Sequence, residues 1–289
     1  MRIEMNGDFI INCDADKTGL TAQGFWFIET RILTRLPTLS NMNTSIEQAC
    51  AIIREANRIV AFSGAGISTE AGIPDFRGKG GMWEDQELME LMSAGGFRRD
   101  PAAFYRATLR TLPNIHRAEP TAAHHLVARL EEQGKLSAVV TQNIDGLHQA
   151  AGSQTVFEIH GNFRTGSCVD CGAAYEMAAF FDRIESGEIE LPLCLACNSP
   201  IKPDVVLFGD LLPFDIWDRA VDASRRCDLM LVLGSSLVVY PAAELPKIAV
   251  MHGAKLIIVN REATDFDPMA GVVVRGSLGD FASEVVKRL

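Results

Sequence analysis

The chain has 289 residues, of which 47% are hydrophobic and 22% are charged, values that are ordinary for a folded globular protein and exclude global disorder. The net charge of −10 argues against a nucleic acid or a membrane surface as partner, because both are polyanions and would be repelled. We find no apolar run near the ~20 residues that cross a bilayer, and we expect a cytoplasmic protein without an export signal.

Residues 1–41 lack sustained helical or alternating periodicity. We expect them to form a leader outside the folded domain, either a flexible arm or a product of start-codon choice. Thr44 and Glu47 fit a capping box, and Ile46, Ala49 and Ile53 follow at helical spacing. This pattern predicts a helix that begins at the capping box and a folded domain that begins near residue 42.

Short apolar runs predict buried parallel strands at residues 58–63, 137–141, 229–233 and 255–260. Helical patterns, such as residues 122–132 and 241–252, alternate with them. The alternation predicts an α/β fold, a Rossmann-type parallel sheet with helices on both faces. Ligands of such sheets bind beyond the carboxyl ends of the strands. Those ends carry small and amide residues suited to phosphate and ribose: Gly64-Ala65-Gly66, Gln142-Asn143, Gly234-Ser235-Ser236 and Asn260.

Two stretches interrupt this alternation. Residues 76–117 are rich in Gly, Met and Phe and are expected to form short helices, and residues 163–202 hold two cysteine pairs. We expect both insertions to build a smaller lobe. The Rossmann-type core then comprises residues of about 42–75, 118–162 and 203–289.

The cysteine pairs Cys168/Cys171 and Cys194/Cys197 are two C-x-x-C knuckles separated by 22 residues. Four thiolates suit one tetrahedral zinc ion, and a helix can fill the gap between the knuckles. A catalytic zinc ion needs an open ligand position, a redox dithiol needs one knuckle only, and a nucleic-acid-binding ribbon would not carry so many acidic neighbours. We therefore predict a structural zinc site.

A glycine turn, Gly64-Ala65-Gly66, follows the first core strand and precedes a helix-like stretch. Glycines in this position let the backbone approach a pyrophosphate, although tight turns of this kind are often only structural. The loop Pro74-Asp75-Phe76-Arg77 follows, and such a loop can cover a cofactor and exclude water.

Together, these motifs resemble the sirtuin family, and specifically its bacterial members. Gly64 to Ser68 with Pro74 to Arg77 looks like the first family signature, Thr141 to His148 like the second, and His160-Gly161-Asn162 like the third. The cysteine knuckles, Gly234 to Leu237 and Val259-Asn260 follow in the family's order. The resemblance covers nearly everything from Ile46 onward.

The resemblance implies an NAD-dependent protein-lysine deacylase that produces nicotinamide, an O-acyl-ADP-ribose and free lysine. His160 then corresponds to the catalytic base that deprotonates a ribose hydroxyl, where a lone histidine would otherwise be read as structural. Asn143 corresponds to the second catalytic residue, which orients ribose and water. The other family contacts to NAD fall on Gly64, Ala65, Thr69, Asp75, Phe76, Arg77, Gln142, Asn143, Ile144, Asp145, Gly234, Ser235, Ser236, Asn260, Arg261 and Leu278.

The acylated-lysine protein or peptide, by the same resemblance, adds to a strand formed by Val206, Leu207, Phe208 and Gly209. Family members that remove succinyl groups carry a Tyr and, three residues on, an Arg. This chain has Tyr105, but Thr108 stands in the second position. Because the bidentate clamp for a carboxylate is missing, we expect acetyl or other neutral acyl groups to be preferred.

Two rival functions stay open from the sequence. An ADP-ribosyltransferase would share the step in which nicotinamide leaves, whereas a dehydrogenase would need a complete glycine fingerprint. A non-catalytic zinc-ribbon module or NAD sensor is disfavoured by the complete set of motifs from Gln142 to His160. We expect a monomer with NAD as co-substrate, one structural zinc ion, and neither a nucleic-acid nor a membrane partner.

Overall fold

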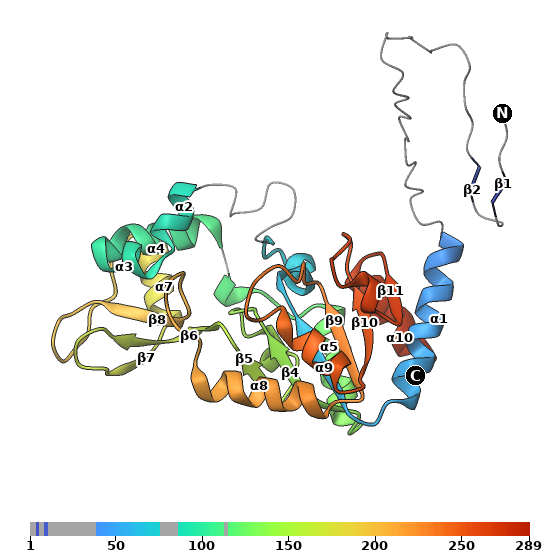
Figure 1. The fold of residues 1–289 in the computed structure, drawn as a ribbon. Coiled ribbons are helices and arrows are strands. Elements are labelled where there is room, and N and C mark those ends of the chain that lie inside the picture. The colour runs from blue at the N-terminus through green and yellow to red at the C-terminus, as the bar shows by residue number, and fades with distance from the viewer. Residues whose placement is uncertain (1–3, 6–8, 11–38, 76–85, 113–114) are drawn as a thin grey trace, which may run out of the picture. The chain divides into compact units, whose positions relative to one another are not determined.

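The computed structural model describes residues 4–5, 9–10, 39–75, 86–112 and 115–289 (Figure 1). The residues up to Leu36 and those from Pro37 onward form two separate units. In the first unit, strand β1 (Glu4–Met5) pairs antiparallel with β2 (Phe9–Ile10). The expected flexibility of residues 1–41 falls mostly outside the described residues and stays a prediction.

The second unit is built on a six-stranded parallel sheet whose strands run in the order β11-β10-β9-β3-β4-β5. This order is that of the doubly wound dinucleotide-binding fold, so the predicted Rossmann-type sheet is confirmed. The four strands predicted for this sheet agree with the observed ones to within one residue at each end. The strands are β3 (Ile59–Ser63), β4 (Leu136–Thr141), β5 (Val156–Glu158), β9 (Leu229–Leu233), β10 (Lys255–Val259) and β11 (Val272–Val274).

Helices cover both faces of this sheet, because successive side chains of each strand point to opposite faces. In β9, Leu231 packs in a cluster with helices α1 (Leu39–Glu55), α5 (Ala122–Glu132) and α10 (Leu278–Arg288). Its neighbour Val232 packs in the opposite cluster, with α8 (Phe214–Arg226) and α9 (Glu244–Met251). Each residue is fully buried, and truncating such a side chain to alanine costs ~2–5 kcal/mol.

The start of α1 differs from the prediction. The helix begins at Leu39, so Thr44 lies inside it and the predicted capping box is wrong. No proline or glycine interrupts residues 39–43, so the helix continues upstream past the expected cap. The predicted apolar face is confirmed, since Ile46, Ala49 and Ile53 are buried against the sheet.

A smaller lobe contains the helical insertion and the cysteine knuckles. Its antiparallel sheet has the order β7-β6-β8, and Phe97, Phe104, Tyr105, Phe181 and Ile201 meet in one hydrophobic cluster. The helices and the sheet of this lobe lie together in Figure 1. The elements are α2 (Gln86–Leu91), α3 (Ala94–Arg99), α4 (Pro101–Thr111), β6 (Gly161–Cys168), β7 (Ala174–Glu176), α7 (Ala178–Glu185) and β8 (Ile201–Val205).

Four short elements complete the described chain: the 3-10 helices η1 (Ala65–Ala71), η3 (Ile115–Arg117) and η4 (Asp267–Met269), and helix α6 (Leu147–Ala150). The predicted strand at residues 205–209 is mostly absent, because β8 ends at Val205 and a turn follows. The Asp210 carboxylate accepts a hydrogen bond from the Leu207 amide at 3.2 Å and closes that turn. Among the described residues, no helix is long and apolar enough to span a bilayer.

Candidate active site

Two glycine loops meet where β3 and β9 lie side by side. This is the switch point of the sheet, since the chain proceeds from β3 to one edge and from β9 to the other. The Gly66 amide donates to the Gly234 carbonyl at 2.9 Å. A Cβ atom on Gly66 would lie 2.7 Å from the Gly234 Cα atom, and Gly234 itself has φ +63°. Only glycine permits this contact, which brings two backbones to the floor of a cavity.

A cavity of about 550 Å³ opens above these loops, within the usual range for a ligand site. Its wall is formed by the ends of the strands, by the loop after β8 and by the N-terminus of α10. The described wall includes 18 of the residues expected from the sequence: Gly64, Ala65, Thr69, Asp75, Gln142, Asn143, Ile144, His160, Val206, Leu207, Phe208, Gly209, Gly234, Ser235, Ser236, Asn260, Arg261 and Leu278. Phe76 and Arg77 lie outside the described residues.

His160 occupies the connection between β5 and β6 and faces this cavity. Its Nδ1 atom lies 3.1 Å from the Gln142 carbonyl oxygen. A carbonyl can only accept, so Nδ1 carries the proton and Nε2 of the neutral ring keeps a free lone pair. Burial lowers the pKa of His160, an effect that the bond to Gln142 partly opposes. The imidazole is therefore held as a neutral base.

The backbone around His160 is tightly constrained. Gly161 has φ +74°, and a Cβ atom there would lie 1.9 Å from the Asp204 carbonyl oxygen. Immediately beyond, the Val206 amide donates to the His160 carbonyl at 2.8 Å. His160 and the loop after β8 are thus tied together through the main chain.

Behind one wall of the cavity lies a polar cluster. The side-chain amide of Asn143 donates from Nδ2 to Ser68 Oγ at 3.1 Å, and Ser68 Oγ donates to Asp145 Oδ2 at 2.6 Å. Burial raises the pKa of Asp145, while the bonds from Ser68 and the Leu147 amide oppose that shift. Asp145 thus lies behind Ser68 rather than on the described wall of the cavity.

Three residues of the cavity lining, Met92, Leu112 and Phe163, belong to the hydrophobic cluster of the small lobe and are here called the apolar branch. The sequence pattern did not single out these three residues, because each reads as an ordinary core residue. Neither Tyr105 nor Thr108 lines the branch. The Tyr105 hydroxyl donates to the Ile201 carbonyl at 2.7 Å, and Thr108 Oγ1 lies 3.5 Å from Met92 Sδ.

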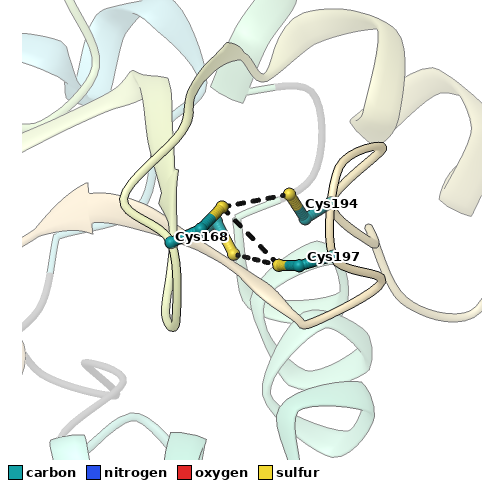
Figure 2. A group of neighbouring side chains, drawn as sticks. Cys168, Cys194 and Cys197 are labelled. Carbon is teal, nitrogen blue, oxygen red and sulfur yellow. Dashed lines mark hydrogen bonds between the residues drawn. The ribbon is translucent and has the colours of Figure 1, made fainter.

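The four knuckle cysteines converge at one end of the small lobe (Figure 2). Sγ–Sγ distances are 3.3 Å for Cys168–Cys197 and 3.5 Å for both Cys171–Cys194 and Cys171–Cys197, and all four sulfurs lie within 4.8 Å of one another. A tetrahedral zinc–thiolate site needs sulfurs about 3.8 Å apart. The four cysteines therefore fit a zinc ion with a closed ligand shell, and α7 fills the gap between the knuckles as predicted.

Tyr175 supports this cluster. Its hydroxyl accepts a hydrogen bond from the Leu195 amide at 3.0 Å and lies 3.1 Å from Cys194 Sγ. The bond from Tyr175 is the largest of several hydrogen bonds that together lower the pKa of Cys194 to about 6. A second group of possible metal ligands, His116, Asp182 and Glu185, is a poorer candidate. The Arg117 guanidinium already contacts both carboxylates, at 2.5 and 3.2 Å.

The strand order and the glycine contact place this chain among the α/β proteins that bind a dinucleotide at the switch point of a parallel sheet. Within that class, the chain belongs to the Sir2 family: the model of the Sir2 family matches residues 64–241, which include the glycine turn, His160 and all four knuckle cysteines.

Relatives with assigned names agree with this membership. The chain is 44% identical over 249 residues to NAD-dependent protein deacylase 2 of Archaeoglobus fulgidus, covering 86% of this chain and 97% of the relative. It is also 44% identical over 236 residues to the NAD-dependent protein deacetylase of Thermotoga maritima, covering 82% and 95%.

Solved structures agree as well. A Sir2 protein with a p53 peptide and NAD⁺ matches with a TM-score of 0.77 and 43% identity, over 84% of this chain and 97% of that one. A Sir2 protein bound to a propionylated peptide matches with a TM-score of 0.76 and 42% identity, over the same shares of the two chains.

Proposed function

We propose that this chain is an NAD-dependent protein-lysine deacylase that releases nicotinamide, an O-acyl-ADP-ribose and the free lysine. The proposal rests on one observation. His160, whose Nε2 atom keeps a free lone pair, lines the same cavity as the contacting glycines Gly66 and Gly234. The relatives named as NAD-dependent deacylases support it.

In this proposal His160 acts as the general base. NAD supplies an anomeric carbon that takes the acyl oxygen as nicotinamide leaves. His160 Nε2 would then take the proton of a ribose hydroxyl, which bonds to the acyl carbon. The lysine amine would leave from that carbon, and one water molecule would add there to give the O-acyl-ADP-ribose. The bond from Nδ1 to Gln142 fixes the ring orientation during this transfer, and burial keeps the ring neutral and able to accept the proton.

The remaining cavity residues would hold NAD. The backbone of Gly64, Ala65 and Gly234 would lie against the phosphates, while the amides of Gly64 and Gly234 stay bonded to the Leu233 and Val259 carbonyls. Ser235 Oγ, which accepts from Gln142 Nε2 at 2.9 Å, would donate to a phosphate. Asn143 would orient the ribose and a water molecule, and Asp145 the nicotinamide amide, together with Ile144. Further contacts are proposed for Thr69, Asp75, Phe76, Arg77, Ser236, Asn260, Arg261 and Leu278.

The acyl-lysine would enter beside Val206, Leu207, Phe208 and Gly209, with its acyl end in the apolar branch. That branch offers no cation to a carboxylate in its described part, since Met92, Leu112 and Phe163 are all uncharged. The Tyr105 hydroxyl is engaged with Ile201. We therefore propose a preference for acetyl and other neutral acyl groups.

We further propose that the four knuckle cysteines bind one structural zinc ion, which stabilises the small lobe. The division into a leader (1–41), a Rossmann-type core, a helical insertion (76–117) and a zinc module (163–202) is part of the same proposal. So are a monomeric state and a cytoplasmic location, where thiols stay reduced.

The decisive experiment incubates the chain with an acetyl-lysine peptide, with and without NAD⁺, and follows nicotinamide release and peptide mass. Loss of the acetyl group, dependent on NAD⁺, is expected. A peptide that instead gains the mass of ADP-ribose would identify an ADP-ribosyltransferase. The variant His160→Tyr should lose turnover but keep its fold and its zinc content, and persistent turnover would refute the assignment of the base.

A further inference from the structure

Two histidines that the proposed reaction does not use lie buried behind Asn143. His124 belongs to α5 and His148 to α6, and both are fully buried. Their rings meet edge to face with centroids 4.7 Å apart. Neither ring lines the cavity, but His148 is linked through Ser63 and Thr141 to Asn143, which does.

The bonds on one side set the proton position of His148. The backbone amide of Asn143 donates to Thr141 Oγ1 at 3.0 Å, and Ser63 Oγ donates to the same oxygen at 2.8 Å. Since the Ser63 proton is used there, Ser63 Oγ must accept from His148 Nε2, 2.8 Å away. His148 therefore carries its proton on Nε2, which leaves Nδ1 as an acceptor.

The bonds on the other side set the proton position of His124. The Thr121 amide donates to His124 Nδ1 at 3.1 Å, so Nδ1 is an acceptor and Nε2 carries the proton. Thr121 Oγ1 lies 2.8 Å from the same nitrogen and 3.1 Å from the Ile67 carbonyl oxygen, so its single proton is shared between these two acceptors.

One buried nitrogen on each ring then has no partner among the described residues: Nε2 of His124 and Nδ1 of His148. One is a donor and the other an acceptor, and they belong to rings in contact. An unsatisfied buried polar group costs ~1–3 kcal/mol, so a buried water molecule that bonds to both nitrogens would stabilise the pair.

We propose that His124 and His148 form one hydrogen-bonded relay that runs through Ser63 and Thr141 and fixes the backbone of Asn143 against the cavity. His148 is thus a positioning residue for the deacylation reaction, and this inference rests on that proposed function. The hydrogen bonds of the relay run in one direction: from His124 Nε2 through a bridging water molecule to His148 Nδ1, from His148 Nε2 to Ser63, and from Ser63 to Thr141.

The first test asks whether the relay positions Asn143. Thr141→Val keeps the shape of the side chain but removes the oxygen that anchors the Asn143 amide, whereas Thr141→Ser keeps the oxygen. With a small displacement of Asn143, kcat for deacylation should fall roughly tenfold in Thr141→Val, with KM for NAD changed by less than about twofold. Thr141→Ser should retain most of the rate.

Ser137→Ala is the matched control for this test. It removes a hydroxyl from the same strand, where Ser137 Oγ donates to the Ile59 carbonyl at 3.0 Å, far from the relay. Its kcat should stay at the wild-type value. An unchanged kcat in Thr141→Val, or an equal loss in Thr141→Ser, would overturn the positioning role.

The second test does not depend on the enzymatic activity of the protein. Two-bond ¹H–¹⁵N spectra of protein labelled at histidine report which ring nitrogen is protonated. At pH 7, both His124 and His148 should be neutral with the proton on Nε2. A proton on Nδ1 of either ring would refute the relay. If the wild-type protein consumed no NAD, the proposed function would fail while this result still stood.

Discussion

Because His124 is buried, we predict that the free energy of unfolding falls in mild acid. Burial lowers its pKa from 6.5 to about 4, so the unfolded chain takes up a proton at a higher pH than the folded protein does. The stabilising contribution is present in full above pH 6.5 and is lost as the pH falls through 4. Between pH 7 and pH 5 this single group should remove about 2 kcal/mol from the free energy of unfolding.

The assay is equilibrium urea unfolding at pH 7 and pH 5, followed by circular dichroism. His124→Asn keeps an acceptor for the Thr121 amide but cannot titrate, so its free energy of unfolding should fall about 2 kcal/mol less over this range than that of the wild type. For a domain of this size the difference corresponds to roughly 4–8 °C in Tm.

The neighbouring residue provides the control. His125 is exposed on the same helix, and its charge is the smaller of the two causes that lower the pKa of His124, so His125→Asn should keep most of the pH dependence of the wild type. His148 adds to the loss in the same direction, because complete burial lowers its pKa well below 6.5. Equal losses between pH 7 and pH 5 in the wild type and in His124→Asn would refute the reasoning.

Four further predictions address the site and the zinc module. Tyr175→Phe removes the hydroxyl beside Cys194 and should weaken zinc retention roughly tenfold, measured as zinc transfer to a chelating dye. Gly66→Ala places a Cβ atom 2.7 Å from the facing loop and should lower the free energy of unfolding by ~1–3 kcal/mol in urea titrations, whereas Gly95→Ala, with its nearest contact at 3.7 Å, should not destabilise. The acid limb of kcat/KM should lie below pH 6.5, because burial lowers the pKa of His160, and a midpoint above 6.5 would contradict this. An acetyl-lysine peptide should be deacylated at least about tenfold faster than its succinyl twin in competition assays read by mass spectrometry.

The sheet was predictable because its signals are local. A buried parallel strand is a run of apolar residues that ends at a turn, and Leu229 to Leu233 shows this with Gly234 directly after it. The carboxyl ends of such strands must share one edge, so Gln142, Ser235 and Asn260 could be assigned to one cavity from the sequence. The predicted start of α1 was wrong, because a capping pattern marks the end of a helix only where the upstream residues resist helix formation.

The apolar branch was not predictable for a physical reason. Met92, Leu112 and Phe163 have the composition of core residues, and only the docking of the insertion against β6 decides which of them face the cavity. The turn after Val205 was also missed, because the local bond between the Leu207 amide and the Asp210 side chain interrupts an apolar run that otherwise has the pattern of a strand. Neither could the relay be read from sequence, since His124 and His148 meet across two helices.

The backbone contact between Gly66 and Gly234 has a consequence for biosynthesis. The two glycines come from opposite halves of the polypeptide, so a nascent chain on the ribosome has no dinucleotide floor until β9 has left the exit tunnel. Premature termination before that point should give a product that cannot capture NAD, however well its early strands collapse. NAD binding to this protein therefore requires that translation has reached the last third of the chain.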